Sequence, residues 1–502
     1  MIKQMVNNEN EGEGNFQISL KPSLIIAVLL QLSLFPIVLV TKDMSVVILF
    51  TSMICILLGI IFLQLRDVSD RVLYVIGVGL LPPFMTIKLE DFPGIFSSDW
   101  MLVLLPTDRI NLPVICAMFL SLLLFLNAVH LKVLFKDRVS IIFSILLGAS
   151  ILIFLSRVDD FERISYYQVA ADYMIILGSF SVYCLMKHSS KSLEEMMQGV
   201  HLIMGILIAI LTIDMVLTIA QIVPWSVNYR NAYAGTLFGM ASEYSLLLCL
   251  SVVYVIITKR SRLLVWTFYV LMALFVAYST MIKSSYQMIV MLFLIVMFLR
   301  VLGPHLGKVI LYGGIAFFVF GISFVLNNPD AVSEDFGSLM ARLGSIIAPI
   351  DVATENLTQT FFGLSPGTLT VNGKSNLALA IFDFGRDSFF ANSNLQGAIV
   401  DEILLRAELD EGGEMSPHVS PVAMLFSYGL ISLPFIFYFW LLVPYRFLKL
   451  QLFKKSEPIH FLVFLYLYMI LFSLLHPVIL LSVIAFFGCL ISKVIAEKTI
   501  KV

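Results

Sequence analysis

The amino-acid sequence predicts an all-α polytopic membrane protein with about fourteen transmembrane helices and one large outer loop. Three observations lead to this fold class. Hydrophobic residues make up 59% of the 502 residues, charged residues make up 13%, and the mean hydropathy is +0.96. Apolar runs recur from one end of the chain to the other, and one hydrophilic stretch, residues 327–417, interrupts them. A single soluble core cannot bury this much apolar surface.

The expected membrane spans are apolar runs of about 20 residues, which as helices cross roughly 30 Å of hydrocarbon. Helices 1–11 are expected within residues 23–326, after an N-terminal tail at 1–22. Helices 12–14 are expected within residues 418–496, before a C-terminal tail at 497–502. The third span contains Pro82-Pro83. The spans lie at approximately 23–41, 44–64, 72–88, 112–134, 139–156, 166–186, 197–224, 232–258, 262–281, 285–302, 308–326, 419–445, 459–475 and 477–496.

The distribution of Lys and Arg predicts the orientation of these spans. If the N-terminus is cytoplasmic, 21 of the 32 Lys and Arg residues fall on the cytoplasmic side. Short cytoplasmic loops are normally rich in positive charge, so we expect both termini inside and the large loop outside. The loop holds 13 acidic and four basic residues. This acidic balance argues against a nucleic-acid partner.

Within the large loop, residues 338–350 and 399–409 carry apolar residues at helical spacing, which predicts short amphipathic helices against the membrane or the helix bundle. The five cysteines all lie in apolar runs, and their spacing indicates neither a disulfide framework nor a zinc site. The loop has no Asp-x-Asp pair. We therefore expect no metal and no other cofactor.

Five ionisable residues are expected near the outer membrane surface: Asp172, Asp214, Arg230, Glu243 and Lys283. Charge at this depth is costly and needs a partner, a hydrated cavity or a function. Two interpretations remain open. The five groups line a hydrated cavity that opens outward, or the acids pair with the cations to hold the bundle together. The two cations are also well placed for lipid phosphates.

The large loop ends in Ser416-Pro417-His418, where the next apolar run begins. A histidine at this junction can meet water and a lipid-borne substrate together, and its ordinary pKa suits proton transfer near neutral pH. The alternative interpretation is an exposed histidine at the start of a helix.

Four segments carry a resemblance to a known family: Arg230 to Gly239, Ser279 to Ser285, Phe362 to Gly367, and His418 to Gly429 with the following Leu-Ile-Ser-Leu. They cover roughly residues 225–440 and resemble the bacterial O-antigen polymerases and ligases, a family of many-helix membrane proteins with an enlarged outer loop. The fourth segment, which begins at His418, departs from the family at Val419 and Ser432. The second segment, which begins at Ser279, has Lys283 where the family usually has Arg. Arg386, separated from Gly397 by ten intervening residues, fits an Arg and Gly spacing of the polymerases.

The resemblance implies metal-independent glycosyl transfer on the periplasmic face. A glycan on undecaprenyl pyrophosphate is the donor, and a sugar hydroxyl of a second lipid-linked repeat unit is the acceptor. Cations should stabilise the departing pyrophosphate, and Arg230, Arg386 and then Lys283 are the candidates. His418 is the candidate general base.

The remaining acids, Asp172, Asp214 and Glu243, are alternative bases or orient the acceptor, and Gly429 allows close helix packing beneath the site. A partner protein that sets chain length is also compatible with this family. Two other functions remain open: a ligase that transfers glycan to the lipid A core, and a flippase or transporter for lipid-linked saccharides. A transporter has no need of a loop of this length, which favours an enzyme.

Overall fold

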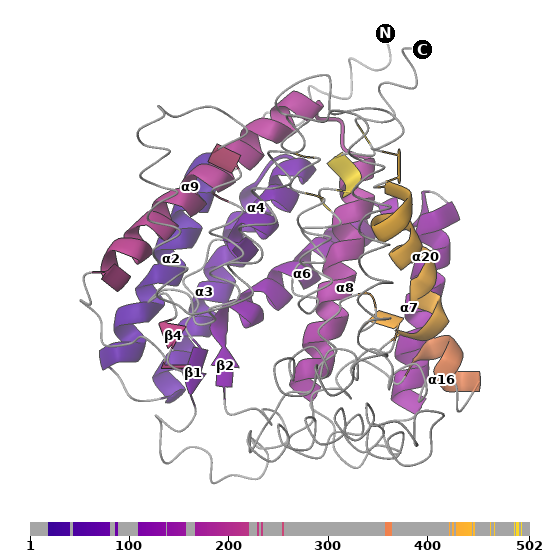
Figure 1. Ribbon diagram of the computed structural model, residues 1–502, viewed down its shortest axis with the longest axis horizontal. Coiled ribbons are helices and arrows are strands. Elements are labelled where there is room, and N and C mark those ends of the chain that lie inside the picture. Colours follow the sequence, from indigo (N-terminus) through magenta and orange to yellow (C-terminus); the bar gives the residue numbers. More distant parts are fainter. Residues whose placement is uncertain are drawn as a thin grey trace, which may run out of the picture.

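The protein is mostly helical in the computed structural model (Figure 1). The structure describes some of the residues of the chain. These are residues 19–40, 44–80, 86–88, 109–136, 138–156, 166–219, 228–229, 232–233, 357–363, 428–443 and 445–446, with single positions 251, 254, 255, 421, 424, 425, 462, 466, 486, 488–490 and 493.

The N-terminal half contains long helices at the first seven expected spans. The first begins in the expected N-terminal tail, and the others begin or end within a few residues of the expected bounds, the third excepted. They are α2 (Leu20–Val40), α3 (Met44–Gln64), α4 (Val68–Leu80), α6 (Leu112–His130), α7 (Arg138–Ser156), α8 (Tyr166–Lys187) and α9 (Leu193–Ile219). A short 3₁₀ turn, η2 (Val133–Phe135), connects α6 to α7.

These helices expose large apolar side chains. Leu63 in α3 is 63% exposed, and Ile145 and Leu152 in α7 are 64% and 68% exposed. Contiguous exposed apolar surface marks contact with a membrane or another protein. Within the described residues, one helix, Leu193–Ile213, has both the length and the apolar composition needed to cross a membrane, and several shorter helices are also apolar.

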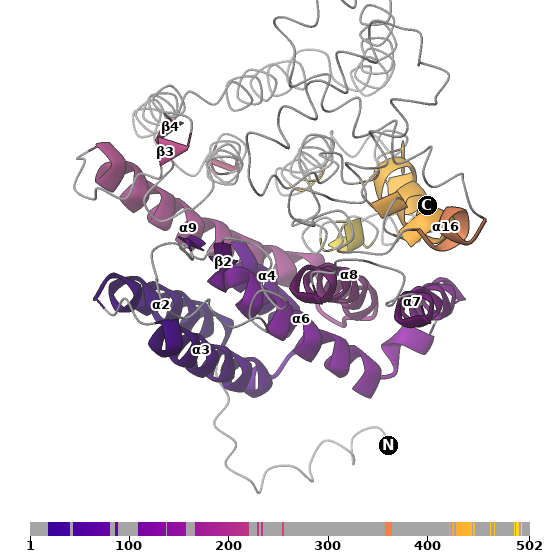
Figure 2. The same ribbon diagram turned by 90° about the horizontal axis from the view of Figure 1, so that it is seen from below.

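The tightest helix crossing lies between α6 and α8, which are neighbours in both views (Figures 1 and 2). A Cβ atom on Gly178 of α8 would lie 2.6 Å from Ser121 Oγ and 2.8 Å from Ser121 Cβ of α6. The missing side chain of Gly178 therefore lets the two backbones approach, as small residues do between helices in membranes. In both views α7 lies on the far side of α8 from α2 and α3.

The third expected span is wrong at its C-terminal end. Helix α4 ends at Leu80, and Thr86–Lys88 form a strand, β1, instead of the last turn of a helix. Pro82-Pro83 account for the stop, because proline lacks an amide donor and disfavours helical geometry in the residue before it. Strand β1 pairs antiparallel with β2 (Arg109–Asn111). Apart from such short ribbons, the described part of the chain is helical, as the expected fold class requires.

Helix α9 begins at Leu193, four residues before the expected start, because its first turn is capped. The Ser192 amide and hydroxyl donate to Glu195 Oε2 at 2.8 and 2.9 Å. The Glu195 amide donates back to Ser192 Oγ at 3.3 Å. This reciprocal Ser-x-x-Glu pattern is a capping box, which satisfies amides that have no partner within the helix.

The expected span at 419–445 is irregular in its described part. Gly429 has φ +65° and starts a 3₁₀ turn, η5 (Gly429–Ser432). A single α turn, α20 (Leu433–Ile436), follows, and then a π-helical segment, η6 (Phe437–Leu442). The Tyr466 hydroxyl donates a hydrogen bond to the Phe439 carbonyl within η6. Side-chain donors of this kind satisfy backbone groups where helix geometry changes.

Described positions near the C-terminus pack against α8, far away in the sequence. The Cys489 thiol donates to the Tyr183 carbonyl at 3.5 Å. Gly488 makes room for a ring, since a Cβ there would lie 2.5 Å from Phe439 Cε1. Phe439 in turn makes an edge contact with Tyr183, with ring centroids 5.9 Å apart. These described positions therefore contact the same helix that packs against α6.

Candidate functional site

The structure describes three of the eight candidate site residues. Gly429 is described in full, and Asp172 and Asp214 are placed by their backbones in α8 and α9. The other five lie outside the described residues: Arg230, Glu243, Lys283, Arg386 and His418. The expected loop helices at 338–350 and 399–409 also lie outside them.

Arg230 and its neighbour Asn231 fall between two described strands. β3 (Asn228–Tyr229) and β4 (Ala232–Tyr233) pair antiparallel, with Tyr229 opposite Ala232. The flanks of the Arg230 segment are therefore held together by strand pairing. A helix was expected from residue 232 onward, so β4 is a correction to the start of that span.

Two of the four family-like segments meet at a glycine junction, which we define as Gly363 and Gly429 with the helix α16 (Leu357–Phe362) that precedes Gly363. A Cβ atom on Gly429 would lie 2.4 Å from the Gly363 amide nitrogen and 2.5 Å from the Phe361 carbonyl oxygen. Gly363 itself has φ +74°. Only glycine fits here, since both the backbone conformation and the close approach exclude a side chain. The large loop is thereby tied to the helix that follows it.

The residue before Gly429 connects the glycine junction to α8. Tyr428 makes an edge contact with Tyr173, with ring centroids 5.9 Å apart and an interplanar angle of 77°. The Tyr173 hydroxyl lies 3.2 Å from Ser150 Oγ of α7. Tyr173 follows Asp172 directly, about 10 Å along the helix from the start of α8. The residue after the candidate acid Asp172 therefore contacts the residue before Gly429.

The two tyrosines that connect the glycine junction to α8 are buried. Tyr173 and Tyr428 are each 6% exposed, so neither presents a face to a substrate. On the outer side of α16, Leu357 and Phe361 are 77% and 51% exposed. This buried packing fixes the backbone positions around the glycine junction.

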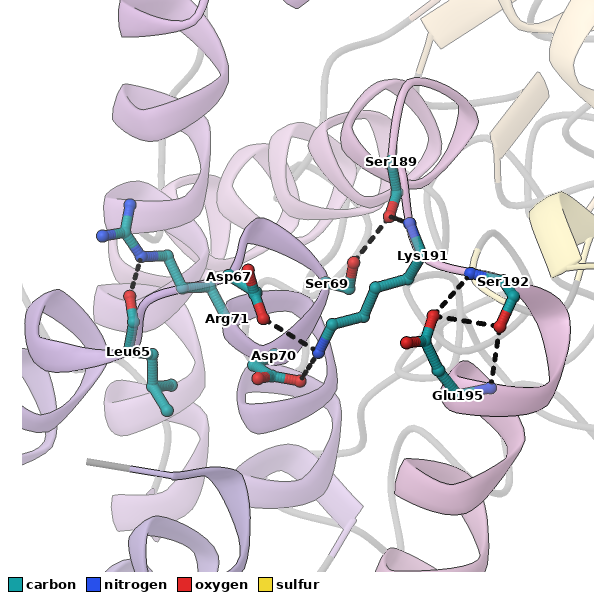
Figure 3. Close-up of polar contacts among 9 residues, drawn as sticks. All are labelled: Leu65, Asp67, Ser69, Asp70, Arg71, Ser189, Lys191, Ser192 and Glu195. Atoms are coloured by element: carbon teal, nitrogen blue, oxygen red, sulfur yellow. Dashed lines mark hydrogen bonds and ion pairs between the residues drawn. The ribbon is translucent and has the colours of Figure 1, made fainter. Parts of the chain in front are cut away.

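At the opposite end of α8, an ion-pair clasp joins two turns (Figure 3). Lys191 lies between α8 and α9, and its Nζ is 2.6 Å from Asp70 Oδ1 in the first turn of α4. The same Nζ is 3.2 Å from Oδ2 of Asp67, which lies between α3 and α4. The Ser69 and Ser189 hydroxyls lie 2.6 Å apart beside it. Partial burial acts to lower the pKa of Lys191, but the bonds and charges of Asp70 and Asp67 outweigh it, and the pKa is raised.

A residue near the C-terminus completes the clasp. Lys493 Nζ donates to the Ser189 carbonyl at 3.0 Å and to the Lys191 carbonyl at 2.5 Å. The α8–α9 turn is thus held by side chains from two distant parts of the chain. Sequence reasoning assigned Lys191 and Lys493 to the cytoplasmic side but did not pair them, because charge counts contain no information about partners.

Helix α16 was also missed by the sequence reasoning. The sequence pattern that could have predicted this helix is only six residues long, and its apolar residues are Leu357, Phe361 and Phe362. The first two lie four positions apart, the spacing of one helix face. A run of six residues is too short to be distinguished from a loop by periodicity alone.

The described side chains offer limited metal-binding chemistry. Among them, no group of three His, Cys, Asp or Glu residues is placed to hold an ion. The closest soft pair is Cys55 and Cys116, whose buried sulfurs lie 3.4 Å apart between α3 and α6. Two thiols are fewer than the three or four protein ligands that zinc sites use.

Comparison of the chain with protein-family models, curated proteins and solved structures finds no match.

Proposed function

We propose that the protein is a polysaccharide polymerase of the plasma membrane, with about fourteen spans, cytoplasmic termini and an active site on the periplasmic face. It transfers a growing glycan from undecaprenyl pyrophosphate to a sugar hydroxyl of a lipid-linked O-antigen repeat unit. A ligase that uses the same donor and the lipid A core as acceptor is the second candidate. A flippase or transporter for the same lipid-linked saccharides is the third.

The membrane part of the proposal is supported by the surfaces of the described helices. Side chains such as Leu63, Ile145 and Leu152 are more than 60% exposed. In water, surface of this kind promotes association, whereas in hydrocarbon it is solvated. The sequence adds recurrent apolar runs and basic residues concentrated on one side.

The observation that best supports the glycosyl-transfer part is the glycine junction. The segments beginning at Phe362 and His418 resemble the family separately, and their glycines Gly363 and Gly429 are in contact. Tyr428 then reaches Tyr173, beside Asp172 in α8. Segments that act on one substrate must lie together, so contact between two of them, near a third candidate residue, favours a shared site over chance resemblance.

The proposed reaction breaks the bond between the donor sugar's anomeric carbon and the pyrophosphate oxygen. The acceptor hydroxyl oxygen forms a new bond to the same carbon, and its proton passes to His418. The pyrophosphate leaves with its bonding electron pair. Arg230 and Arg386, with Lys283, stabilise the negative charge that develops on it. Asp172, Asp214 and Glu243 orient the acceptor or replace His418 as base.

Purified protein in lipid vesicles, mixed with repeat units on undecaprenyl pyrophosphate, tests the proposal directly. We expect a ladder of glycans that differ by one repeat unit. His418→Ala and Arg230→Gln should each reduce the ladder about 100-fold or more, as the loss of a general base or of a charge-stabilising group does. His188→Ala and Arg66→Gln change the same residue types at the clasp end and should leave the ladder intact.

Each alternative function gives a different result in the same vesicles. Transfer to added lipid A core without a ladder identifies a ligase. Movement of the intact lipid-linked unit across the bilayer, with neither transfer product, identifies a transporter. A full ladder from His418→Ala removes His418 from the mechanism, because no other histidine takes its place at the loop end.

A further inference from the structure

The turn between α6 and α7 combines exposed positive charge with exposed apolar side chains. We define the basic turn as residues Leu131 to Lys136. Lys132 and Lys136 are exposed, and neither makes an ion pair with a described residue. Leu131 and Phe135 are 37% and 61% exposed. Charged and apolar groups therefore share one small surface.

The basic turn is fixed in place by its two central residues. Val133 and Leu134 are 4% and 2% exposed and anchor η2 in the core. The Phe135 amide donates to the Lys132 carbonyl at 3.4 Å, and the Lys136 amide donates to the Val133 carbonyl at 3.3 Å. The two lysines and the phenyl ring thus project from a backbone that is already ordered, which lowers the entropic cost of binding.

Lys132 occupies a backbone position that favours glycine. Its φ is 54°, and among described non-glycine residues it is the one with positive φ. Its amide donates to the Val129 carbonyl at 2.9 Å, which ends α6. Glycine is the usual residue after a helix in this left-handed conformation, because a Cβ atom is strained there. Lysine at this position carries backbone strain that glycine would avoid, and its side chain adds a positive charge to the surface.

The combination of groups identifies the class of partner. Lysines attract phosphate headgroups, and an aromatic ring beside them enters the interface between headgroups and acyl chains. We propose that the basic turn binds anionic phospholipid headgroups, such as phosphatidylglycerol, in the inner leaflet of the membrane. This inference rests on the proposed membrane location and goes beyond the proposed catalytic function.

The position of the basic turn fits that leaflet. Ser140 Oγ, near the start of α7, lies 3.4 Å from Cys184 Sγ, near the end of α8. The basic turn is therefore at the same end of the helices as Lys187 and the ion-pair clasp, and at the other end from Tyr173 and the glycine junction. Arg138 follows the turn in the sequence, and Asp137 is the one acidic residue between Leu131 and Arg138. The stretch keeps a net positive charge.

A local fluorescence reporter tests this proposal in the full-length protein. Phe135→Trp keeps an aromatic ring in the basic turn, and its emission is obtained by subtracting the spectrum of the parent protein. The reporter protein is placed in vesicles of phosphatidylcholine and phosphatidylglycerol in which one lipid or the other is brominated. We expect stronger quenching by the brominated phosphatidylglycerol, and weaker preference as salt rises.

Charge variants of the reporter protein separate lipid recognition from folding. Lys132→Gln and Lys136→Gln should each lower the relative affinity for phosphatidylglycerol about fivefold. Lys132→Gly should lower it equally while the unfolding temperature stays level or rises, since backbone strain is relieved. Lys132→Arg should keep the preference. Arg66→Gln is the matched control, because Arg66 is an exposed cation beside Asp67 and should not contribute.

Three results would overturn the proposal. Equal quenching by the two brominated lipids would show that the basic turn has no headgroup preference. No quenching by either lipid would show that the basic turn lies away from lipid, and would favour an acidic protein surface as its partner. An equal loss in Arg66→Gln means that general surface charge is responsible. Release of the whole protein from vesicles by alkaline washing is a separate result, because it contradicts the membrane location on which the proposed function also depends.

Discussion

Gly429 lies against Gly363 so closely that a Cβ atom on Gly429 would be 2.4 Å from the Gly363 amide nitrogen. The two residues are 66 positions apart and belong to different family-like segments. Gly429 cannot be exchanged for another residue without movement of a backbone, because the obstructing atoms around it are backbone atoms. The junction is therefore a rigid connection between the large loop and the helix after it.

Gly429→Ala should destabilise the protein and loosen this connection. The left-handed backbone alone costs about 1–2 kcal/mol for a residue with a Cβ atom, and the clash with Gly363 and Phe361 adds to it. Thermal unfolding in detergent measures the loss. Gly148→Ala in α7 is the matched control, since nothing lies within 4 Å of a Cβ there and alanine is the better helix former. Equal unfolding temperatures for the two variants would contradict the tight junction.

Lys191→Gln should lower the free energy of unfolding by about 1–2 kcal/mol, because Asp70 loses its partner while only 18% of its side chain is exposed. The effect should depend on pH. The folded-state pKa of Lys191 is raised above its ordinary value of 10.5, so the clasp contributes fully below that value. Its contribution is lost as pH rises through the raised pKa.

The measurement is the difference in unfolding temperature between the parent protein and Lys191→Gln, from neutral to strongly alkaline pH. A difference in unfolding temperature that is constant near neutral pH and narrows only at strongly alkaline pH agrees with the raised pKa of Lys191. Lys21→Gln serves as control, since Lys21 is exposed at the start of α2 and should show little difference at any pH. A difference that already closes near neutral pH would show that Lys191 is not the titrating group.

Tyr466→Phe should cost about 1–3 kcal/mol although it removes a single oxygen atom. The lost hydroxyl leaves the Phe439 carbonyl without its side-chain donor, and both residues are almost fully buried. Chemical denaturation with an unchanged slope would report a pure stability change. Tyr445→Phe, at a side chain that is 56% exposed, should change the stability by less than about 0.5 kcal/mol.

A paired substitution tests the crossing of α6 and α8. Gly178→Ala should separate the helices, because the new Cβ meets Ser121 Oγ at 2.6 Å. Ser121→Gly removes the obstructing atoms, so the double variant should recover most of the stability that Gly178→Ala loses. Unfolding of all four proteins gives the coupling energy directly. Additive losses would mean that the two residues do not meet.

Sequence reasoning located the helices of the N-terminal half well, since long apolar runs leave the chain few alternatives in lipid or in a core. Its failures have local causes. The run at 72–88 was treated as helical through Pro82-Pro83, and the structure replaces its end with β1. The run at 419–445 contains Gly429, whose positive φ follows from contact with Gly363 and is invisible to hydropathy.

The candidate site was predictable only in part. Depth along a helix follows from the sequence, and it placed Asp172 toward one end of α8. Contacts between segments depend on tertiary packing, so the approach of Tyr428 to Tyr173 could not be derived from either segment alone. The roles assigned to His418, Arg230, Arg386, Lys283, Glu243 and Asp214 remain predictions.

The bonds from Lys493 to the Ser189 and Lys191 carbonyls set an order of assembly. The two partners are synthesised 304 and 302 residues before Lys493. At about 5–20 residues per second, the α8–α9 turn must wait roughly 15–60 s on the ribosome for this lysine. During that interval Asp67 and Asp70 are the partners of Lys191 that have already been made. The ion pairs of Lys191 with Asp67 and Asp70 can therefore form before the bonds from Lys493 complete the clasp.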